Sequence, residues 1–360
     1  MTSFSQAIES ALEQAMSEDE RVVIFGEDVQ MLRRNLLVRF GSSRVRNTPI
    51  SESAFLGAAV GAAMAGLRPV VEIMLVDFIG VALDPLLNHA AKLKTFSGGR
   101  WSSPLVVRAA CGGGYGDGGQ HGQTLWGMLA GIPGLTVVVP SNPADAAGLM
   151  LSAIADDGPV VYLEHKLLSD YWLDYLGAGN RRTVSFDVPS DGAHGVVQEP
   201  PAPVPTGVAA TLREGSDVAL VSLGVGVHRC LQAARTLAER GVQCAVLDLR
   251  TVAPLDRQAV VALADSTGHV IAVDEDYTSG GLSGEIAALL AESTSGVRFA
   301  RVTTMETLPY SRAQEDATLP NAQRIIDAAE DMLNERGTST ALSRATSSIR
   351  REPATASHRQ

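Results

Sequence analysis

Residues 47 to 66 read Asn47-Thr-Pro-Ile-Ser-Glu-Ser-Ala-Phe-Leu-Gly-Ala-Ala-Val-Gly-Ala-Ala-Met-Ala-Gly66, and this stretch decides the fold. It places one carboxylate, Glu52, before a run of small residues. Pro49 disfavours helix before it, Ser51 can cap the backbone N–H groups that follow, and the last glycine is placed to end a helix. The stretch therefore predicts a helix over about residues 51–65. An acid at its start is also explained simply by the favourable field of a helix N-terminus.

The predicted helix is unusually rich in small residues. Gly57 and Gly61 stand four apart among alanines, although glycine lowers helix propensity. Another backbone or a flat ligand could therefore approach this helix closely. The uncharged run 53–67 is 15 residues long, against the roughly 20 that a bilayer span needs. We expect a buried helix of a globular protein and no membrane segment.

Length and composition indicate an ordinary globular protein of about two domains. The chain has 360 residues, 45% of them hydrophobic, and a formal net charge of −11. An acidic balance of this size argues against nucleic acid or an anionic membrane and favours small molecules or proteins as partners. Cys111, Cys230 and Cys244 are too few for a disulfide framework or a zinc site. Since the N-terminus also lacks a signal pattern, we expect a cytoplasmic protein.

Apolar runs of strand and helix character alternate along the first part of the chain. Residues 22–25 form a buried strand pattern that ends in Gly26-Glu27-Asp28, so acids follow the carboxyl end of a strand. Such alternation predicts a parallel sheet covered on both faces, with ligands beyond the carboxyl ends of its strands. Further expected strands are 69–74, 104–109, 135–139 and 159–163, and the expected helices are 77–95, 123–131 and 142–155.

A proline-rich segment interrupts the alternation, which then resumes. We expect a first domain over residues 1–177, a surface linker at 178–212 and a second domain over 213–336. Residues 337–360 lack periodicity and are predicted to be disordered. The expected fold class is α/β with two doubly wound domains. The second has expected strands at 217–222, 243–248, 268–273 and 298–304, and helices at 226–240, 256–264, 281–291 and 321–335.

A glycine-rich loop from Cys111 to Gln123 carries a histidine placed beyond a strand's carboxyl end. His121 is our candidate acid or base, although a lone loop histidine can equally face solvent. The surrounding glycines argue that backbone must come close to another group. In the same loop Gly116-Asp117-Gly118, followed by Asn142, imitates a magnesium-diphosphate motif. Because Asp117 lies within the loop and Asn142 opens a helix, we interpret this match as a decoy.

The remaining motifs offer little chemistry. Residues 277–285 follow an expected strand and open a helix, which could be a phosphate cradle. Without a lysine or a G-x-G-x-x-G pattern, a tight strand-to-helix connection is the simpler interpretation. The sequence has no P-loop, no H-E-x-x-H and no G-x-S-x-G, so nucleotide-binding and hydrolase functions lack support.

Six motifs in order carry a resemblance that covers nearly all of residues 1–335. They are Gly26-Glu-Asp-Val29, Thr48-Pro-Ile-Ser-Glu52, Gly119-Gln-His-Gly-Gln123, Pro133-Gly-Leu135, Asp248-Leu-Arg-Thr-Val-Ala-Pro-Leu-Asp256 and Gly280-Gly-Leu-Ser-Gly-Glu-Ile286. In this order they resemble the beta subunit of the thiamine-diphosphate-dependent 2-oxo acid dehydrogenase family, which is transketolase-like and includes pyruvate, branched-chain and acetoin enzymes. Several motifs together are more specific than any one alone.

The resemblance implies a pyrimidine-binding domain followed by a transketolase-type C-terminal domain. It implies thiamine diphosphate as the cofactor and an α2β2 heterotetramer whose alpha subunit holds the diphosphate and Mg²⁺. The implied activity is that of a 2-oxo acid or acetoin dehydrogenase, with oxidative decarboxylation and acyl transfer to lipoyl-lysine on an acyltransferase core. A magnesium motif that is only imitated in this chain agrees with that division between subunits.

The resemblance also implies roles for single residues. Glu52 resembles the family glutamate that bonds to nitrogen 1′ of the aminopyrimidine, where a shared proton favours the tautomer that removes the thiazolium proton. Glu27 matches an acid of the cofactor region, on a proton path between paired active sites. Phe78 matches an aromatic residue packed against the pyrimidine, which requires a flat apolar face. His121 matches the histidine of decarboxylation or acyl transfer. Positions that bind potassium in some members match Leu105, Ala153, Asp156 and Gly158.

The sequence departs from the family pattern near the implied active site. The loop after Val29 is about six residues shorter than is usual in the family. Because such loops commonly carry function, the sequence leaves the identity of the substrate open. Gly122 stands where the family usually has serine, and a histidine usual before the Pro-Gly pair is replaced around Gly131. Two alternatives also stay open, namely the C-terminal subunit of a split transketolase and a non-catalytic homologue.

Overall fold

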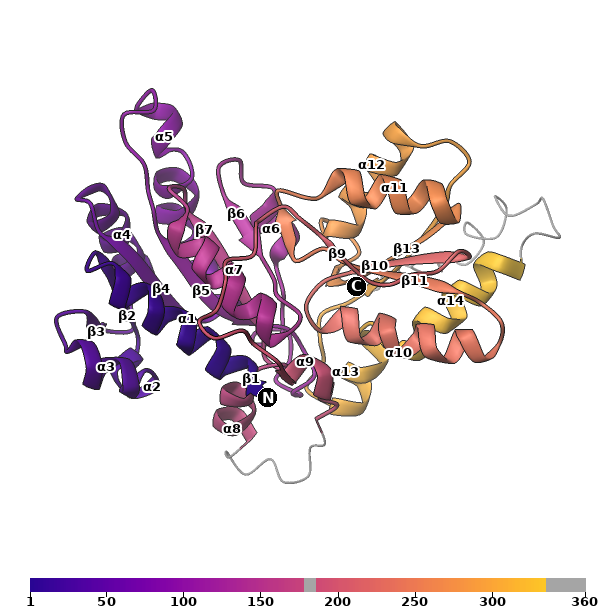
Figure 1. Cartoon of the computed structure of the whole chain (residues 1–360), viewed down its shortest axis with the longest axis horizontal. Coiled ribbons are helices and arrows are strands. Elements are labelled where there is room, and N and C mark those ends of the chain that lie inside the picture. Colours follow the sequence, from indigo (N-terminus) through magenta and orange to yellow (C-terminus); the bar gives the residue numbers. More distant parts are fainter. Residues whose placement is uncertain (178–185, 335–360) are drawn as a thin grey trace, which may run out of the picture.

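The computed structural model describes residues 1–177 and 186–334, which form two neighbouring α/β lobes (Figure 1). Each lobe is a mainly parallel sheet with helices on both faces, as the alternation of elements predicts. The prediction of disorder at residues 337–360 falls outside the described residues. So do residues 178–185 of the expected linker.

Seven strands form the sheet of the first lobe, and they are parallel except at one edge. β2 pairs with β4 in parallel from Val22 opposite Arg68 to Gly26 opposite Glu72, so the carboxyl ends of these strands lie together. The antiparallel edge strand β12 comes from the second half of the chain, and the two halves therefore share a sheet. In spatial order the strands are β12 (Thr251–Ala253), β6 (Thr136–Val138), β7 (Val160–His165), β5 (Val106–Cys111), β4 (Arg68–Leu75), β2 (Val22–Gly26) and β3 (Val45–Asn47).

Successive side chains of these strands point to opposite faces, and helices cover both faces. On one face the core contains apolar residues of α1 (Phe4–Glu18) and α7 (Pro143–Ala155). On the other it contains those of α4 (Glu52–Met64) and α6 (Trp126–Ala130). Burial of Phe55 and Leu56 against this second face fixes the start of α4, and with it Glu52, near the strands' carboxyl ends.

The second lobe contains a five-stranded sheet in the order β14 (Arg298–Thr304), β13 (His269–Tyr277), β10 (Val218–Ser222), β11 (Cys244–Asp248) and β9 (Ala210–Arg213). Only β9 runs antiparallel to its neighbour among these described strands. α10 (Val225–Glu239) and α14 (Ala322–Asn334) cover one face, and α11 (Arg257–Thr267) and α12 (Leu282–Ser293) cover the other. The apolar core on the α11 and α12 side is continuous with that beneath α4.

The single helix predicted at 77–95 is wrong. The chain instead forms a 3₁₀ segment η1 (Val76–Ala82), a π segment η2 (Pro85–Ala90) and a short helix α5 (Leu93–Phe96). Pro85 lacks an N–H and clashes with the preceding turn, so a continuous α-helix cannot pass through it. The break leaves Phe78 in a tight turn directly after β4.

The helix predicted over 51–65 is confirmed within a residue at each end, but two details differ. Ser51 lies at the N-cap, yet its hydroxyl donates to the Ile50 carbonyl (2.7 Å) and caps no N–H group. The helix is also buried along one face only, because Gly57 and Gly61 are exposed in this chain. The small-residue face of α4 therefore points away from the core.

The expected linker has more structure than its proline content predicts. It contains α9 (Ser190–Ala193) and β8 (His194–Gly195), and β8 pairs with β1 (Thr2–Ser3) at the N-terminus. Short elements that the sequence patterns did not predict are α2 (Val29–Leu32), α3 (Arg34–Phe40), α8 (Asp170–Gly177) and α13 (Arg312–Thr318). Across the described ranges, no helix is both long and apolar enough to cross a membrane.

Candidate active site

Two acids meet beyond the carboxyl end of β2. Glu27 follows Gly26, the last residue of that strand, and the amide of Thr48 donates to the Gly26 carbonyl (2.9 Å). This bond holds the segment that leads into Glu52, the first residue of α4. Both acids are half-buried. Burial raises the pKa of Glu27, and the charges of Asp28 and Glu52 raise it further, so Glu27 lies within electrostatic reach of Glu52.

Gly26 explains how this strand end can approach its neighbour. A Cβ atom at this position would collide with the backbone carbonyl of Glu72 on β4. Only glycine therefore allows β2 to end here with Glu27 turned toward the site. Asp28 then adopts a left-handed conformation, with φ of 53°, and begins α2.

An aromatic ring and the candidate histidine lie together on the next elements. The ring centroids of Phe78 and His121 are 5.9 Å apart, with an angle of 87° between the ring planes. Such an edge-to-face contact is favourable for aromatic rings. Both residues are half-buried, so each ring has a surface open to a ligand. The structure thus brings together two of the residues that the motifs select.

Three polar residues of this region were missed in the sequence. The Gln123 amide donates to Asp77 Oδ1 (2.7 Å), and the Tyr277 hydroxyl donates to Gln123 Oε1 (3.2 Å). Asp77 Oδ2 is buried and has no hydrogen-bond partner in the described part of the chain, and burial raises the pKa of this carboxyl. Asp77 precedes Phe78 and Gln123 ends the motif that contains His121, which are usable signals, whereas the segment 277–285 that begins at Tyr277 gave no indication of a contact with this site.

The glycine loop is tightly covered, as its composition predicts. A Cβ atom at Gly118 would lie 2.8 Å from the Tyr310 ring, and one at Gly122 would lie 2.9 Å from Leu308. The group that the backbone must approach is therefore the second lobe of the same chain. The loop also donates N–H groups to carboxylates of that lobe, from Gly113 to Glu275 (2.7 Å) and from Gly114 (2.9 Å) and Gly116 (2.7 Å) to Glu315.

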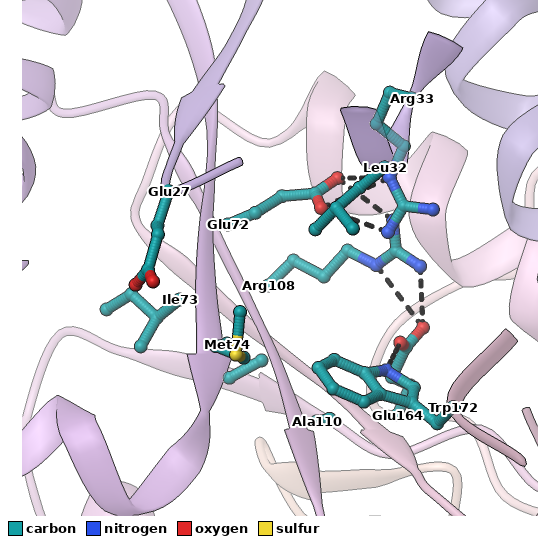
Figure 2. Close-up of a pocket in the computed structure, with 11 residues that line it drawn as sticks. Glu27, Leu32, Arg33, Glu72, Ile73, Met74, Arg108, Ala110, Glu164 and Trp172 are labelled. Atoms are coloured by element: carbon teal, nitrogen blue, oxygen red, sulfur yellow. Dashed lines mark hydrogen bonds and ion pairs between the residues drawn. The ribbon is translucent and has the colours of Figure 1, made fainter. Parts of the chain in front are cut away.

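A buried charge network links the neighbouring strands β4, β5 and β7 (Figure 2). Arg33 donates twice to Glu72, from Nε (2.8 Å) and Nη2 (2.9 Å), and Arg108 bridges Glu72 (3.0 Å) and Glu164 (2.7 Å). Burial would raise the pKa of Glu72, but the charges of Arg33 and Arg108 outweigh it and hold the pKa below its usual value. Glu27 lines the same small cavity, so this network lies next to the candidate site.

The residues matched to a potassium site lie around the end of α7 and the start of β7. The Leu105 carbonyl accepts from the Val160 amide (2.9 Å), and Asp156 Oδ1 accepts from the Gly158 amide (2.7 Å). The Arg68 guanidinium donates to the carbonyls of Ile154 (3.0 Å) and Asp156 (2.9 Å). Ala153 lies in the last turn of α7. The region offers oxygen atoms, as a hard cation requires, but a positive charge already binds two of them.

Two weaker motifs have structural explanations. Asn142 is the N-cap of α7 and accepts from the Asp145 amide (3.0 Å), which is the role expected if the magnesium motif is a decoy. At the start of α12 the Ser283 amide donates to Asp274 (2.7 Å). A carboxylate of the chain itself thus occupies part of the possible phosphate cradle, which favours a tight connection. Groups of three or more His, Cys, Asp or Glu side chains able to hold a metal are absent from the described residues.

Comparisons with known proteins first define the class. Residues 1–170 match the family described as "Transketolase, pyrimidine binding domain", and residues 207–325 match "Transketolase, C-terminal domain". A solved structure entitled "Split gene transketolase, inactive beta4 tetramer" superposes with a TM-score of 0.74. It covers 92% of this chain and 98% of its own, at 22% identity, and at that identity it supports the fold alone. The chain is a transketolase-type protein.

Sequence relatives then define the family. The acetoin:2,6-dichlorophenolindophenol oxidoreductase subunit beta of Cupriavidus necator is 36% identical over 347 residues, which cover 91% of this chain and 96% of the relative. The 2-oxoisovalerate dehydrogenase subunit beta of Bacillus subtilis is 34% identical over 92% of this chain and 98% of its own. The pyruvate dehydrogenase E1 component subunit beta of the same organism is 35% identical over 91% and 97%. The chain belongs to the beta subunits of the thiamine-diphosphate-dependent 2-oxo acid dehydrogenase family.

Proposed function

We propose that this chain is the beta subunit of the decarboxylating component of a 2-oxo acid or acetoin dehydrogenase complex. The observations that support the proposal are two pairs of residues, Glu27 with Glu52 beyond the end of β2, and the contacting rings of Phe78 and His121 in the segments that follow β4 and β5. A transketolase-type fold binds ligands at the carboxyl ends of its strands, where all four residues lie. The family is thiamine-diphosphate dependent, and its members named above are subunits of larger enzymes.

The residues present fit the aminopyrimidine half of thiamine diphosphate. Asp77 Oδ2 and Thr48 Oγ1 are buried polar atoms that lack a hydrogen-bond partner among the described residues. A buried polar atom normally has a partner, so these two indicate a missing polar ligand nearby. Phe78 offers a ring face to a flat heterocycle. When bound, the cofactor supplies the carbon nucleophile and the electron sink for cleavage beside the substrate's carbonyl group.

The protein's own contribution is to hold and move protons. Glu52 would hold a proton between its carboxylate and nitrogen 1′ of the pyrimidine, and Glu27 would exchange protons with Glu52. The raised pKa of Glu27 supports this, since it makes the acid easier to protonate. His121 would move a proton at the substrate or the departing acyl group, because its ring is half-exposed beside the place of the cofactor.

Partners and ions complete the proposal. An alpha subunit would hold the diphosphate and Mg²⁺ in an α2β2 heterotetramer, and a lipoyl acyltransferase core would accept the acyl group. The exposed small-residue face of α4 supports a close subunit contact next to Glu52. We propose potassium as a structural ion at the oxygen atoms around the end of α7. Stabilisation of the protein by KCl but not by NaCl would support it, and equal stability in both salts would remove it.

We also propose the location and the division of the chain. The protein would act in the cytoplasm, with domains at residues 1–177 and 213–336, although β12 extends from the second into the first sheet. The split-transketolase alternative has support from the fold alone, since the relatives at 34–36% identity are dehydrogenase subunits. A non-catalytic homologue is disfavoured because the chain retains the acid pair and the histidine, all of which follow the carboxyl ends of strands of one sheet.

The test of function is reconstitution with the alpha subunit, followed by assays of pyruvate, 2-oxoisovalerate and acetoin with a dye acceptor and with a lipoyl domain. We expect turnover of one of these substrates with both acceptors. Glu52→Ala should lower turnover by about 10²–10⁴-fold, the usual contribution of a positioned proton-transfer group. Glu20→Ala, at an exposed acid, is a control for removal of a carboxylate. Near-normal turnover of an assembled Glu52→Ala enzyme would refute the mechanism.

A further inference from the structure

Lys166 is a fully buried lysine that none of the roles above uses. It follows His165, the last residue of β7, and its side chain has 0% exposure. A lysine is rarely buried without a partner, because desolvating its ammonium group is costly. Burial lowers the pKa of Lys166, and the carboxylates of Asp117 and Asp77 oppose that shift. The fold thus keeps an amine at a place where an apolar side chain would be less costly to bury.

The contacts of Lys166 converge on the glycine loop. Its Nζ donates to the backbone carbonyl of His121 and lies 4.0 Å from Asp117 Oδ2 in the same loop. The ammonium lies 5.0 Å from the centre of the Tyr115 ring, and the Tyr115 hydroxyl donates back to the Lys166 carbonyl (3.1 Å). A single side chain therefore contacts the loop at residues 115, 117 and 121.

These contacts differ from those at the start of the loop. Glu275 and Glu315 accept N–H groups there, from Gly113, Gly114 and Gly116. Around His121 the loop instead presents a carbonyl to a cation. A charge-assisted hydrogen bond is about twice as strong as a neutral one and fixes the peptide that carries the imidazole. The His121 ring can then keep its edge-to-face contact with Phe78, with the two ring centroids 5.9 Å apart.

We propose that Lys166 is a positioning residue for His121. Its ammonium holds the His121 carbonyl behind the loop, so that the imidazole stays at the mouth of the site. The inference rests on the proposed role of His121 as the group that moves a proton near the substrate. Lys166 does not touch the reacting atoms, since it contacts the backbone of the loop and has no exposed surface.

The test is a double-mutant cycle in the enzyme reconstituted with its alpha subunit, with turnover measured by dye reduction and by acylation of a lipoyl domain. Lys166→Met should lower the kcat of the step that needs His121 by about 10–100-fold, as expected for a small misplacement of a catalytic group. KM should change little. The variant should also shift the limb of the pH profile that His121→Ala removes. In the His121→Ala background, Lys166→Met should cause less than about a twofold further loss, because non-additivity marks residues that act as one unit.

Control variants separate this effect from folding and from charge. Lys94→Met, at an exposed lysine, should leave kcat unchanged. Lys166→Gln keeps an N–H donor for the His121 carbonyl without the buried charge, and its kcat should lie between those of Lys166→Met and the wild type. It replaces Lys166→Met in the test if that variant assembles poorly. A kcat equal to that of the wild type in assembled Lys166→Met or Lys166→Gln enzyme would overturn the inference. So would a loss of kcat in the His121→Ala background as large as the loss that Lys166→Met causes in the wild type. Full activity of His121→Ala alone would instead refute the proposed role of that histidine.

Discussion

At the scale of single residues, buried acids of this protein fall into two groups. Glu72 is compensated by Arg33 and Arg108, and its charge is stabilised. Asp248 is fully buried and accepts from the Arg250 amide (2.9 Å) and from the Ser141 hydroxyl, and the charge of Arg250, which pairs with Asp145, offsets only part of the effect of burial. Burial raises the pKa of Asp248 to about 7. We therefore expect the stability of the protein to depend on pH at Asp248, where burial outweighs the nearby positive charge.

Asp248 predicts the direction of the pH dependence of stability. An unfolded aspartate titrates near 3.8, so between pH 4 and 7 the folded state binds this proton more tightly than the unfolded state. The stabilisation is complete below that range and is lost as pH rises through about 7. Asp248→Asn should remove this slope, which is worth on the order of a few kcal/mol, in urea unfolding between pH 4 and pH 8. Asp331→Asn, at an exposed acid, should keep it.

At the scale of elements, the strand ends are held by the charge network of Figure 2. Arg108 on β5 bridges Glu72 on β4 and Glu164 on β7, so three neighbouring strands depend on one guanidinium. The Trp172 indole of α8 also donates to Glu164. Because Arg33 lies between α2 and α3, the same network anchors the shortened loop that follows Glu27.

Removal of Arg108 should therefore be severe. Arg108→Met leaves Glu72 and Glu164 short of a buried positive charge, and we expect a loss of about 3–5 kcal/mol in the free energy of unfolding. Arg257→Met is the matched control, since Arg257 pairs with Glu285 and Glu292 at the surface and should cost below about 1 kcal/mol. Urea unfolding of the two variants measures both values. Similar losses would show that the network is not a structural support.

The elements that sequence patterns predicted are those with a buried apolar face. α4 and the central strands were found within one or two residues because periodicity and glycine or proline signals agree there. The helix at 77–95 failed at Pro85, whose effect was overlooked against an apolar pattern. Short elements such as α8, α9 and β8 have no period of their own, because pairing with distant residues forms them.

The site was predicted only as far as motifs reach. Glu27, Glu52, Phe78 and His121 were selected by family resemblance, and the structure places Glu27 within electrostatic reach of Glu52 and the Phe78 ring against that of His121. Tyr277 was missed because it belongs to the second lobe and reaches the site only in the folded chain. Lys166 was missed because a lysine normally predicts a surface position.

At the scale of the whole molecule, the proposed site lies next to an exposed helix face, that of α4. The two lobes share β12 and one continuous core, so they behave as a single support for the loop that carries His121. The small-residue face of α4, by contrast, is exposed at Gly57 and Gly61. A partner that closes over this face would also cover Glu52, which lies at the start of the same helix.

A bulky residue on that face should separate folding from assembly. A Cβ atom at Gly61 meets nothing within 4 Å, so Gly61→Leu should leave the isolated chain at least as stable as the wild type. The variant should nevertheless fail to form a complex with the alpha subunit in light scattering after size-exclusion chromatography. Ala262→Leu, on the exposed side of α11, should assemble normally. Normal assembly of Gly61→Leu would exclude this face from the subunit contact.

The most direct measurement is calorimetric titration of thiamine diphosphate, with Mg²⁺ present, into this chain alone, the alpha subunit alone and the two together. If each polypeptide holds half of the cofactor, the mixture should bind it with one site per αβ pair and at least 100-fold more tightly than either subunit, which corresponds to about 2.7 kcal/mol. Glu52→Gln should keep the assembly and weaken this binding. Equal affinity of the isolated chain and the mixture would contradict the account.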